Sequence, residues 1–299
     1  KMLGLAVALA VLLVPATIIG VTVLTFSADA LPLSQKLPRM LLMGVGYAFY
    51  FGAIIGLALA VSAWARSSRT SLITLLGFWM LNCLLLPRAA SDLARKLHPT
   101  PSAFAFAQLL DTDLKKGMDG HTPQEERRKA LEAKVLSQYK VKSVEALPIN
   151  FVGIVLQESE NYGYQVFDRR YAQLWSTIES QNSLNQLMAF LAPMLATRNW
   201  SMAMAGTDFA QHRRFAQAAE THRRLIQKTM NDDILAHPVR GKPHFGNAAL
   251  WSQVPEFDYQ IPALSWVVGQ QLLSLGVLAL WLAAGITAAI WSANRLQAE

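Results

Sequence analysis

Charged residues are scarce in this sequence. Asp, Glu, Lys and Arg make up 16% of its 299 residues, whereas soluble domains carry about 25%. Each of four stretches is long enough to cross a bilayer core of about 30 Å as a helix that rises about 1.5 Å per residue. The charge-free stretches are Met2–Phe26, Met40–Ala65, Thr70–Pro87 and Tyr259–Asn294. The shortage of charge therefore argues against a soluble protein and predicts four transmembrane helices.

Other missing groups exclude further functions. The single cysteine, Cys83, excludes an intrachain disulfide. The sequence contains no glycine-rich P-loop motif, no HExxH and no GxSxG, so it carries none of these signatures of nucleotide or hydrolytic chemistry. The net charge of +7 is spread thinly, without the dense Lys/Arg cluster that nucleic-acid binding needs. We expect no cofactor, no metal and no nucleic-acid partner for this chain.

The four stretches also lack ionisable side chains, which matters for transport. Charged residues inside a membrane mark ion relays and coupling sites, and none lies within these stretches. This disfavours transport coupled to protons or sodium, so any driving energy must come from a partner. The polar residues that the stretches do contain, such as Asn82, Gln270 and Gln271, are expected to make hydrogen bonds between helices. A role in lining a substrate path is the alternative.

The stretches divide the chain into three parts. Residues 1–87 hold three predicted spans, residues 88–258 form a polar domain, and residues 259–299 hold the last span and a short tail. The three spans are predicted at about 2–26, 40–65 and 70–87. The chain starts at Lys1 and enters a span at once, which predicts that further residues precede it.

A short loop sets the orientation. The loop Ala65–Thr70 contains Arg66 and Arg69 and no acidic residue. Lys and Arg in short loops indicate the cytoplasmic side, so this loop and the C-terminal tail are predicted inside. The loop at 27–39 and the polar domain at 88–258 are then predicted outside.

The polar domain is predicted to be mainly helical. Thr122-Pro123-Gln124-Glu125 has the form of a capping box and predicts a helix over about 123–139. Asp208 is a candidate cap for a second helix, over about 209–230. Between them, residues 151–186 place aromatic and apolar side chains at helical spacing, and alternation with a period of two is almost absent. The sequence thus predicts an all-α membrane protein.

The segment Leu184–Ala205 is too apolar for a surface that faces water, yet Pro193 and Arg198 interrupt it. Two locations are open at this point. It forms the core of the polar domain, or it lies at the membrane interface or dips into the membrane. Trp200 and Arg198 suit the interface.

Two smaller patterns have competing interpretations. Gly52 and Gly56 form a GxxxG motif, which brings helix backbones close together, either within the chain or at a dimer seam. Asp208 and His212 are four residues apart and could share a metal ion. A solvated basic helix face explains this second region more simply.

Two regions resemble a known family. The first is Ala63–Thr70 with the following span as far as Leu86–Ala94, and the second is Leu191–Pro193 with Ser201–His212, which reads Ala-Gly-Thr-Asp at 205–208. Together they resemble the bacterial ABC-2-type transporter permeases that have a large periplasmic domain of unknown function before the last transmembrane span. The resemblance covers essentially the whole chain, and its most specific residues are Ala205, Gly206, Thr207, Asp208 and His212.

The resemblance implies the transmembrane subunit of an ABC exporter in the bacterial inner membrane. Such permeases have six spans, so the four predicted here are the last four. A separate ATPase subunit would bind ATP and Mg²⁺, and a second permease subunit, identical or related, would complete the transporter. The loop would face the ATPase, with Arg66, Ser67, Ser68 and Arg69 as candidate contacts. A periplasmic or outer-membrane protein is a further candidate partner.

Two other classes of function compete with the exporter. The chain could be a membrane-anchored sensor or assembly platform whose polar domain binds another envelope protein. It could also be a membrane enzyme, although only Asp208 and His212 support that class. No motif identifies a transported substrate.

Overall fold

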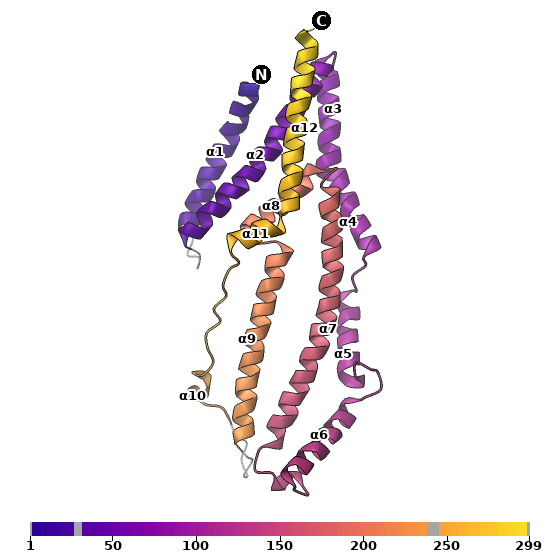
Figure 1. Ribbon diagram of the computed structural model, residues 1–299, viewed down its shortest axis with the longest axis vertical. Helices are drawn as coiled ribbons and strands as arrows, with labels where there is room; N and C mark the ends of the chain where they lie inside the picture. Colours follow the sequence, from indigo (N-terminus) through magenta and orange to yellow (C-terminus); the bar gives the residue numbers. More distant parts are fainter. Residues whose placement is uncertain (1, 27–31, 238–244, 298–299) are drawn as a thin grey trace. The chain divides into compact units, whose positions relative to one another are not determined.

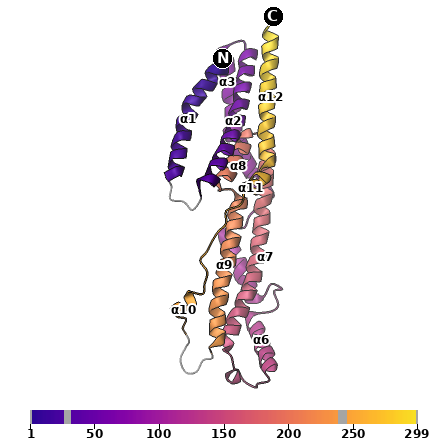
Figure 2. The same cartoon turned by 60° about the vertical axis from the view of Figure 1, so that its left-hand side comes forward.

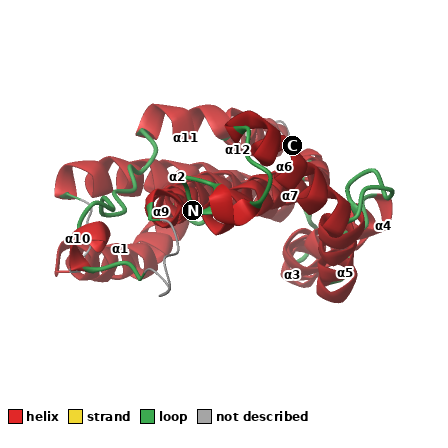
Figure 3. Ribbon diagram, turned by 90° about the horizontal axis from the view of Figure 1, so that it is seen from below, coloured by secondary structure: helices red, strands yellow, loops and turns green. Residues whose placement is uncertain are grey.

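The described part of the chain is built from helices. A computed structural model describes residues 2–26, 32–237 and 245–297, and no β-strand occurs in these ranges. Figure 3 shows helices joined by loops only. The all-helical prediction is confirmed. The helices are α1 (Met2–Phe26), α2 (Leu33–Trp64), α3 (Ser68–Met80), η1 (Leu81–Leu85), α4 (Leu86–Leu97), α5 (Ala103–Lys116), α6 (Gln124–Tyr139), η2 (Val144–Ala146), α7 (Phe151–Met188), α8 (Pro193–Ala205), α9 (Phe209–Ala236), α10 (Ala248–Trp251), α11 (Leu264–Gln270) and α12 (Leu272–Gln297) (Figure 1).

The chain divides into two compact units. The apolar unit consists of Lys1–Leu97, Ser180–Arg213 and Ile261–Glu299, and the polar unit consists of His98–Glu179 and Arg214–Gln260. The segment 184–205 therefore belongs to the apolar unit, which favours the membrane alternative over the core of the polar domain. The prediction that residues 88–258 form a domain on the outer side of the membrane remains a prediction.

Three helical segments are long and apolar enough to cross a membrane. They are Leu33–Trp64, Ser68–Leu97 and Leu272–Arg295, and they identify the chain as a membrane protein. Helix α1 contributes only a shorter apolar stretch, Leu13–Val23, to the described residues. A fourth span therefore stays a prediction.

The second span begins earlier than predicted. Helix α2 starts at Leu33, after Pro32, so Lys36 and Arg39 lie in the helix and not in an outer loop. Both side chains are buried. Most of the predicted loop at 27–39 is thus helical, and its residues 27–31 lie outside the described part of the chain.

The third span continues beyond Pro87, where the sequence predicted its end. A π-helical turn, Leu81–Leu85, joins α3 to α4, and the Leu86 N–H bonds to the Leu81 carbonyl instead of to Asn82. Proline lacks an N–H and crowds the preceding turn, and a widened turn just before Pro87 gives its ring space. The helix therefore runs on to Leu97.

The fourth apolar stretch is interrupted. The chain is not helical at 259–263, α11 is short, and α12 begins only at Leu272. The predicted start of this span at Tyr259 is wrong. Gln271 separates α11 from α12 with a non-helical backbone (φ −117°, ψ 15°). Its buried side chain accepts a hydrogen bond from Ser274 Oγ at 2.9 Å, so the break leaves this polar group satisfied.

The helices α2 and α12 run side by side and touch through glycines (Figures 1 and 2). A Cβ atom at Gly56 would lie 2.5 Å from the carbonyl carbon of Gly285, and one at Gly52 would lie 2.6 Å from Leu282 Cδ1. The GxxxG motif thus packs two helices of the same chain. The structure favours this interpretation over a dimer seam, since Gly56 is buried within the apolar unit.

One predicted helix cap is confirmed and another is wrong. Asp208 Oδ1, in the apolar unit, accepts the Gln211 N–H at 3.0 Å at the start of α9, as predicted. The capping box at Thr122 does not form, because the residue at the cap position of α6 is Pro123, and Thr122 Oγ1 donates to Asp119. That bond and the His121 N–H lower the pKa of Asp119 to about 2. Helix α6 then starts after Pro123, without a side-chain cap.

The glycine contact predicts a difference between two alanine substitutions in α2. Gly56→Ala forces the backbones of α2 and α12 apart and should lower the free energy of unfolding by about 1–3 kcal/mol. Gly44→Ala is the control, because nothing lies within 4 Å of a Cβ there, and alanine favours helix. Thermal unfolding of both variants in detergent measures the difference, and equal midpoints would contradict the contact.

Candidate functional site

The candidate ATPase-facing loop is a tight exposed turn between α2 and α3. Helix α2 ends at Trp64, and the Ala65 N–H bonds to the Val61 carbonyl. Ser67 caps α3 by accepting the Thr70 N–H at 3.2 Å. The four candidate residues are all exposed: Arg66, Ser67, Ser68 and Arg69. Because the turn is short and Ser67 caps α3, a displacement of the turn would move both α2 and α3.

The segment 184–205 forms a helical hairpin, which we call the α7–α8 hairpin. Its first arm is the end of α7, and its second arm is α8, which starts at Pro193 and is largely buried. Three side-chain hydrogen bonds connect it to the rest of the apolar unit. Trp281 Nε1 donates to the Phe190 carbonyl at 3.0 Å, the Met194 N–H donates to Asn82 Oδ1 at 3.3 Å, and Trp200 Nε1 donates to the Leu42 carbonyl at 2.7 Å.

Each of these bonds reaches a different part of the apolar unit. Trp281 is in α12, Asn82 is in η1, and Leu42 is in α2. The Trp200 ring also fills the space left by Gly46, where a Cβ would lie 2.2 Å from the ring. Trp200 is therefore a core residue of the apolar unit, 1% exposed, and not the interfacial anchor that was one of the alternatives left open by the sequence.

Asn82 joins α8 to α2. Its side chain is 1% exposed, and its Nδ2 donates to the Tyr50 hydroxyl at 3.2 Å while its Oδ1 accepts from Met194. The first N–H groups of a helix lack partners within it, and the residue before α8, Ala192, has no side chain to cap it. Asn82 supplies that acceptor from another helix. The interhelical role predicted for Asn82 is confirmed.

The motif Ala205–His212 forms the joint between α8 and α9. Gly206 ends α8 with a positive φ of 78°, and the Thr207 N–H bonds to the Met202 carbonyl at 2.9 Å, which closes the turn. Asp208 is buried and caps α9, whereas His212 is exposed. Among the described residues no group of three or more His, Cys, Asp or Glu could hold a metal ion. The motif thus has a structural role, in which a carboxylate oxygen of Asp208 caps the start of α9.

Arg39 ties this joint to α2. Its guanidinium is buried and donates to the Pro262 carbonyl at 2.7 Å and to Gln211 Oε1 at 3.5 Å. Gln211 in turn donates to the Ala203 carbonyl at 2.7 Å. Sequence reasoning placed Arg39 in a loop because the predicted span began at Met40, the first residue of the charge-free stretch. Pro32, just before Leu33, favours the start of a helix there and could have indicated that Arg39 is helical.

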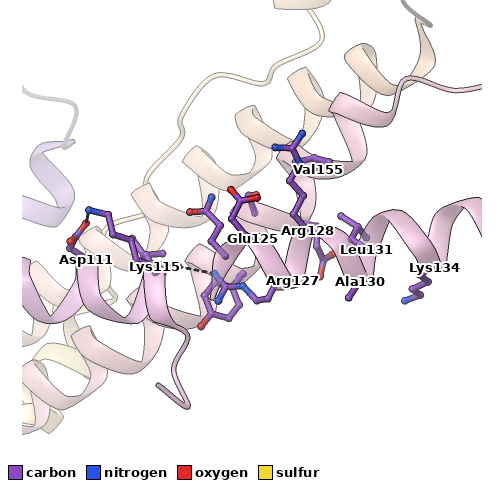
Figure 4. A pocket seen from close by; sticks show the side chains of 14 residues that line it. Asp111, Lys115, Glu125, Arg127, Arg128, Ala130, Leu131, Lys134 and Val155 are labelled. Carbon is purple, nitrogen blue, oxygen red and sulfur yellow. Dashed lines mark hydrogen bonds and ion pairs between the residues drawn. The ribbon is translucent and has the colours of Figure 1, made fainter. Parts of the chain in front are cut away.

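The polar unit contains an open pocket of about 680 Å³ between α5, α6 and α7. In Figure 4, Lys115 and Asp111 lie together on one side of it, and α6 contributes Arg127 and Arg128. The Arg127 guanidinium stacks 3.8 Å from the Tyr162 ring and donates to the carbonyls of Thr122 and Leu114. These contacts therefore fix the Arg127 side chain in the wall of the pocket. The lining combines both signs of charge with apolar residues, which suits a binding role more than a catalytic one.

An ion pair beside this pocket holds α5 to α7. Arg170 donates to Asp113 through Nε at 2.6 Å and Nη2 at 2.8 Å. The hydrogen bonds from Arg170 lower the pKa of Asp113 below its usual value, although burial opposes the shift. Tyr162 adds a bond to the Asp113 carbonyl at 3.2 Å. The C-terminal end of α5 is thus well anchored.

These observations define a helical membrane protein with a polar helical unit. Residues 106–260 match the family model described as a domain of unknown function, DUF3526. The match covers more than half of the chain, and the chain belongs to this family. It includes the α7–α8 hairpin and the joint at 205–212. A search of curated proteins and a search of solved structures each find no match.

The position of Asn82 predicts that its loss destabilises the apolar unit. Asn82→Ala leaves the Met194 N–H and the hydroxyl of the buried Tyr50 without this partner, which should cost about 1–3 kcal/mol of unfolding free energy. Thr74→Ala, at an exposed position of the same span, should change stability by less than about 0.5 kcal/mol. Denaturant unfolding in detergent measures both, and a neutral Asn82→Ala would contradict the cap.

The Asp113–Arg170 pair predicts a pH dependence. A carboxyl whose pKa is lower in the folded state stabilises it fully above the unfolded value of about 3.9 and loses this effect as pH falls through the folded value. Asp113→Asn should cost about 1.5–3 kcal/mol at pH 7, and its difference from the unsubstituted protein should shrink below about pH 4. Circular dichroism melts at pH 7, 4 and 3 measure this. Asp111→Asn, at an exposed pair, is the control and should have little effect at any pH.

Proposed function

We propose that the chain is the transmembrane permease subunit of an ABC exporter, which moves a substrate across the bacterial inner membrane with ATP hydrolysed by a separate subunit. The observation that carries this proposal is the exposed two-arginine turn at 66–69, which joins two membrane-length helices directly. A short stiff connection of this kind suits the transmission of work from a cytoplasmic motor.

The apolar helices support the same proposal. Between Met40 and Trp64, between Thr70 and Pro87, and between Leu272 and Asn294 there is no ionisable side chain of Asp, Glu, Lys, Arg or His. Coupling to an ion gradient would need such groups, so an external source of energy fits better. The resemblance of Ala63–Thr70 and Ser201–His212 to ABC-2-type permeases adds to this.

The remaining parts of the transporter follow from the proposal. The ATPase binds ATP and Mg²⁺ and touches Arg66, Ser67, Ser68 or Arg69. A second permease subunit completes the membrane part, and the polar unit lies in the periplasm. These four spans are then the last four of six.

A second candidate function is a membrane-anchored sensor or assembly platform. The pocket between α5, α6 and α7 favours it, because its lining combines charges of both signs with apolar residues, which suits the binding of another envelope protein. Deletion of the gene separates the two candidates. A transport defect supports the exporter, whereas loss of a crosslinked partner without a transport defect supports the platform.

The exporter predicts an ATP-binding partner. The chain, purified from its native membranes in mild detergent, should carry an ATPase subunit. A variant with Arg66→Ala and Arg69→Ala should retain about 5- to 30-fold less of it, as expected for a loss of 1–2 kcal/mol. Mass spectrometry of the purified material measures the recovery.

A matched variant tests whether the effect is local. Arg128→Ala with Lys129→Ala removes two exposed charges from α6 in the polar unit, and it should leave the recovery of the ATPase unchanged. If the unsubstituted chain brings down no ATPase, and removal of a neighbouring ATPase gene does not alter its level, the exporter proposal is wrong.

A further inference from the structure

A short segment of the polar unit, Pro255–Gln260, has no regular secondary structure and lies against α9. We call it the α9 strap. In Figures 1 and 2 the chain between α10 and α11, which contains the strap, runs beside α9 as a single open trace. Its side-chain contacts show how it is held and which of its groups stay available.

Aromatic side chains attach the α9 strap to α9. The centroid of the Phe215 ring lies 5.9 Å from that of Phe257 and 5.1 Å from that of Tyr259, both with edge-to-face geometry. Seven residues further along α9, the His222 ring lies 5.3 Å from the Phe257 ring. Edge-to-face pairs are more favourable than the area they bury. Two residues of the strap, Phe257 and Tyr259, are thus fixed on one helix.

Two further contacts show that the α9 strap has the conformation of a β-strand. On the side that faces α9, the Phe257 and Tyr259 rings stack with centroids 6.4 Å apart, close to the roughly 6.6 Å that two residues of a strand span. Another pair two residues apart also meets, because Gln260 Nε2 donates to Asp258 Oδ2 at 2.7 Å. Alternate side chains therefore share a side, as they do in a strand.

The backbone of the α9 strap is left without partners. The five consecutive N–H groups from Glu256 to Gln260 make no hydrogen bond to any described residue, and the carbonyls of these residues accept none from the described chain. A strand in this state presents a row of donors and acceptors to another chain. Many peptides bind proteins by joining such a row as an additional strand.

The charge of the α9 strap indicates which peptide fits. Glu256, Asp258 and Gln260 are all exposed, and no Lys, Arg or His occurs between Phe245 and Asn294. Opposite charges on facing strands stabilise the pair, and like charges destabilise it. Lysine or arginine side chains on the added strand would therefore be favourable beside the two carboxylates. A second copy of the strap would bring only further carboxylates.

We propose that the α9 strap is a docking strand, which binds an extended segment of a partner protein as a second β-strand. The bound segment carries lysine or arginine at alternating positions, next to Glu256 and Asp258. The proposal does not depend on the exporter function, because an exporter and an assembly platform could each use such a partner. It is also separate from the pocket between α5, α6 and α7.

Synthetic peptides test the proposal on the full chain, purified in an uncharged detergent. The first probe is a fluorescent peptide of alternating lysine and valine. The second has the same sequence with every backbone nitrogen methylated, so it keeps its charge and loses its N–H donors. The third alternates glutamate and valine. Fluorescence anisotropy measures the Kd of each peptide.

The lysine–valine peptide should bind, and the other two should bind at least about 10-fold more weakly, as expected for the loss of a few backbone hydrogen bonds or of the charge pairs. Equal affinity of the methylated peptide would overturn the proposal, because charge alone would then explain the binding. Absence of saturable binding by the lysine–valine peptide would overturn it too. Self-association of the chain without peptide binding would indicate that a second copy covers the strap, against the proposal.

Matched variants locate the bound peptide. Glu256→Gln with Asp258→Asn removes both charges of the α9 strap and should weaken binding of the lysine–valine peptide several-fold. Glu126→Gln with Glu145→Gln removes two exposed carboxylates elsewhere in the polar unit, and it should leave the affinity unchanged. Equal affinities of the two double variants would contradict docking at the strap.

Amide hydrogen exchange gives a readout that charge alone does not change. Neighbouring N–H groups of a strand point to opposite edges, so one added strand should slow exchange only at every second amide from Glu256 to Gln260. Mass spectrometry with electron-transfer fragmentation resolves these amides. Unchanged exchange in the strap while the lysine–valine peptide is bound would place the peptide elsewhere and would refute the proposal.

Discussion

The apolar unit depends on the close approach of α2 and α12. The backbones nearly touch where Gly56 meets Gly285, and any larger residue at either position would separate the helices. Helix α8 packs against both of them, and its Trp200 occupies the space beside Gly46 of α2. Two glycines of α2, Gly46 and Gly56, thus determine where two other helices can lie. Dispersion contacts of this kind are weak singly and strong together, and they need no polar group.

Neutral amides accompany three irregularities in this unit. Asn82 caps α8, Gln271 satisfies Ser274 at the break before α12, and Gln211 closes the joint between α8 and α9. An amide offers both a donor and an acceptor, and it avoids the cost of burying a charge. Arg39 is the exception, and its guanidinium is held by uncharged acceptors. The pattern explains how an apolar unit tolerates so many helix ends.

Local patterns predicted the helical class, the approximate locations of three apolar helices but not their ends, and the cap at Asp208. They failed where a distant or competing partner decides the structure. Lys36 and Arg39 look like loop residues until the burial of Arg39 against Gln211 and Pro262 is known. Thr122 looks like a cap until α6 is seen to begin one residue later, with Pro123 at the cap position and Thr122 bonded to Asp119. Pro87 looks like a helix end until the π-helical turn is taken into account. The contacts of the α7–α8 hairpin join residues more than 90 positions apart, and no sequence window contains both partners.

The order in which these partners are made has a consequence for biosynthesis. Leu42 and Asn82 leave the ribosome well before the α7–α8 hairpin, but Trp281 follows Phe190 by 91 residues. The Phe190 carbonyl therefore lacks its partner during most of synthesis, and the turn at Ala189–Ala192 interrupts the uncharged stretch around it. Assembly of the hairpin must wait for α12, so the last helix to be made completes an element that was translated long before it.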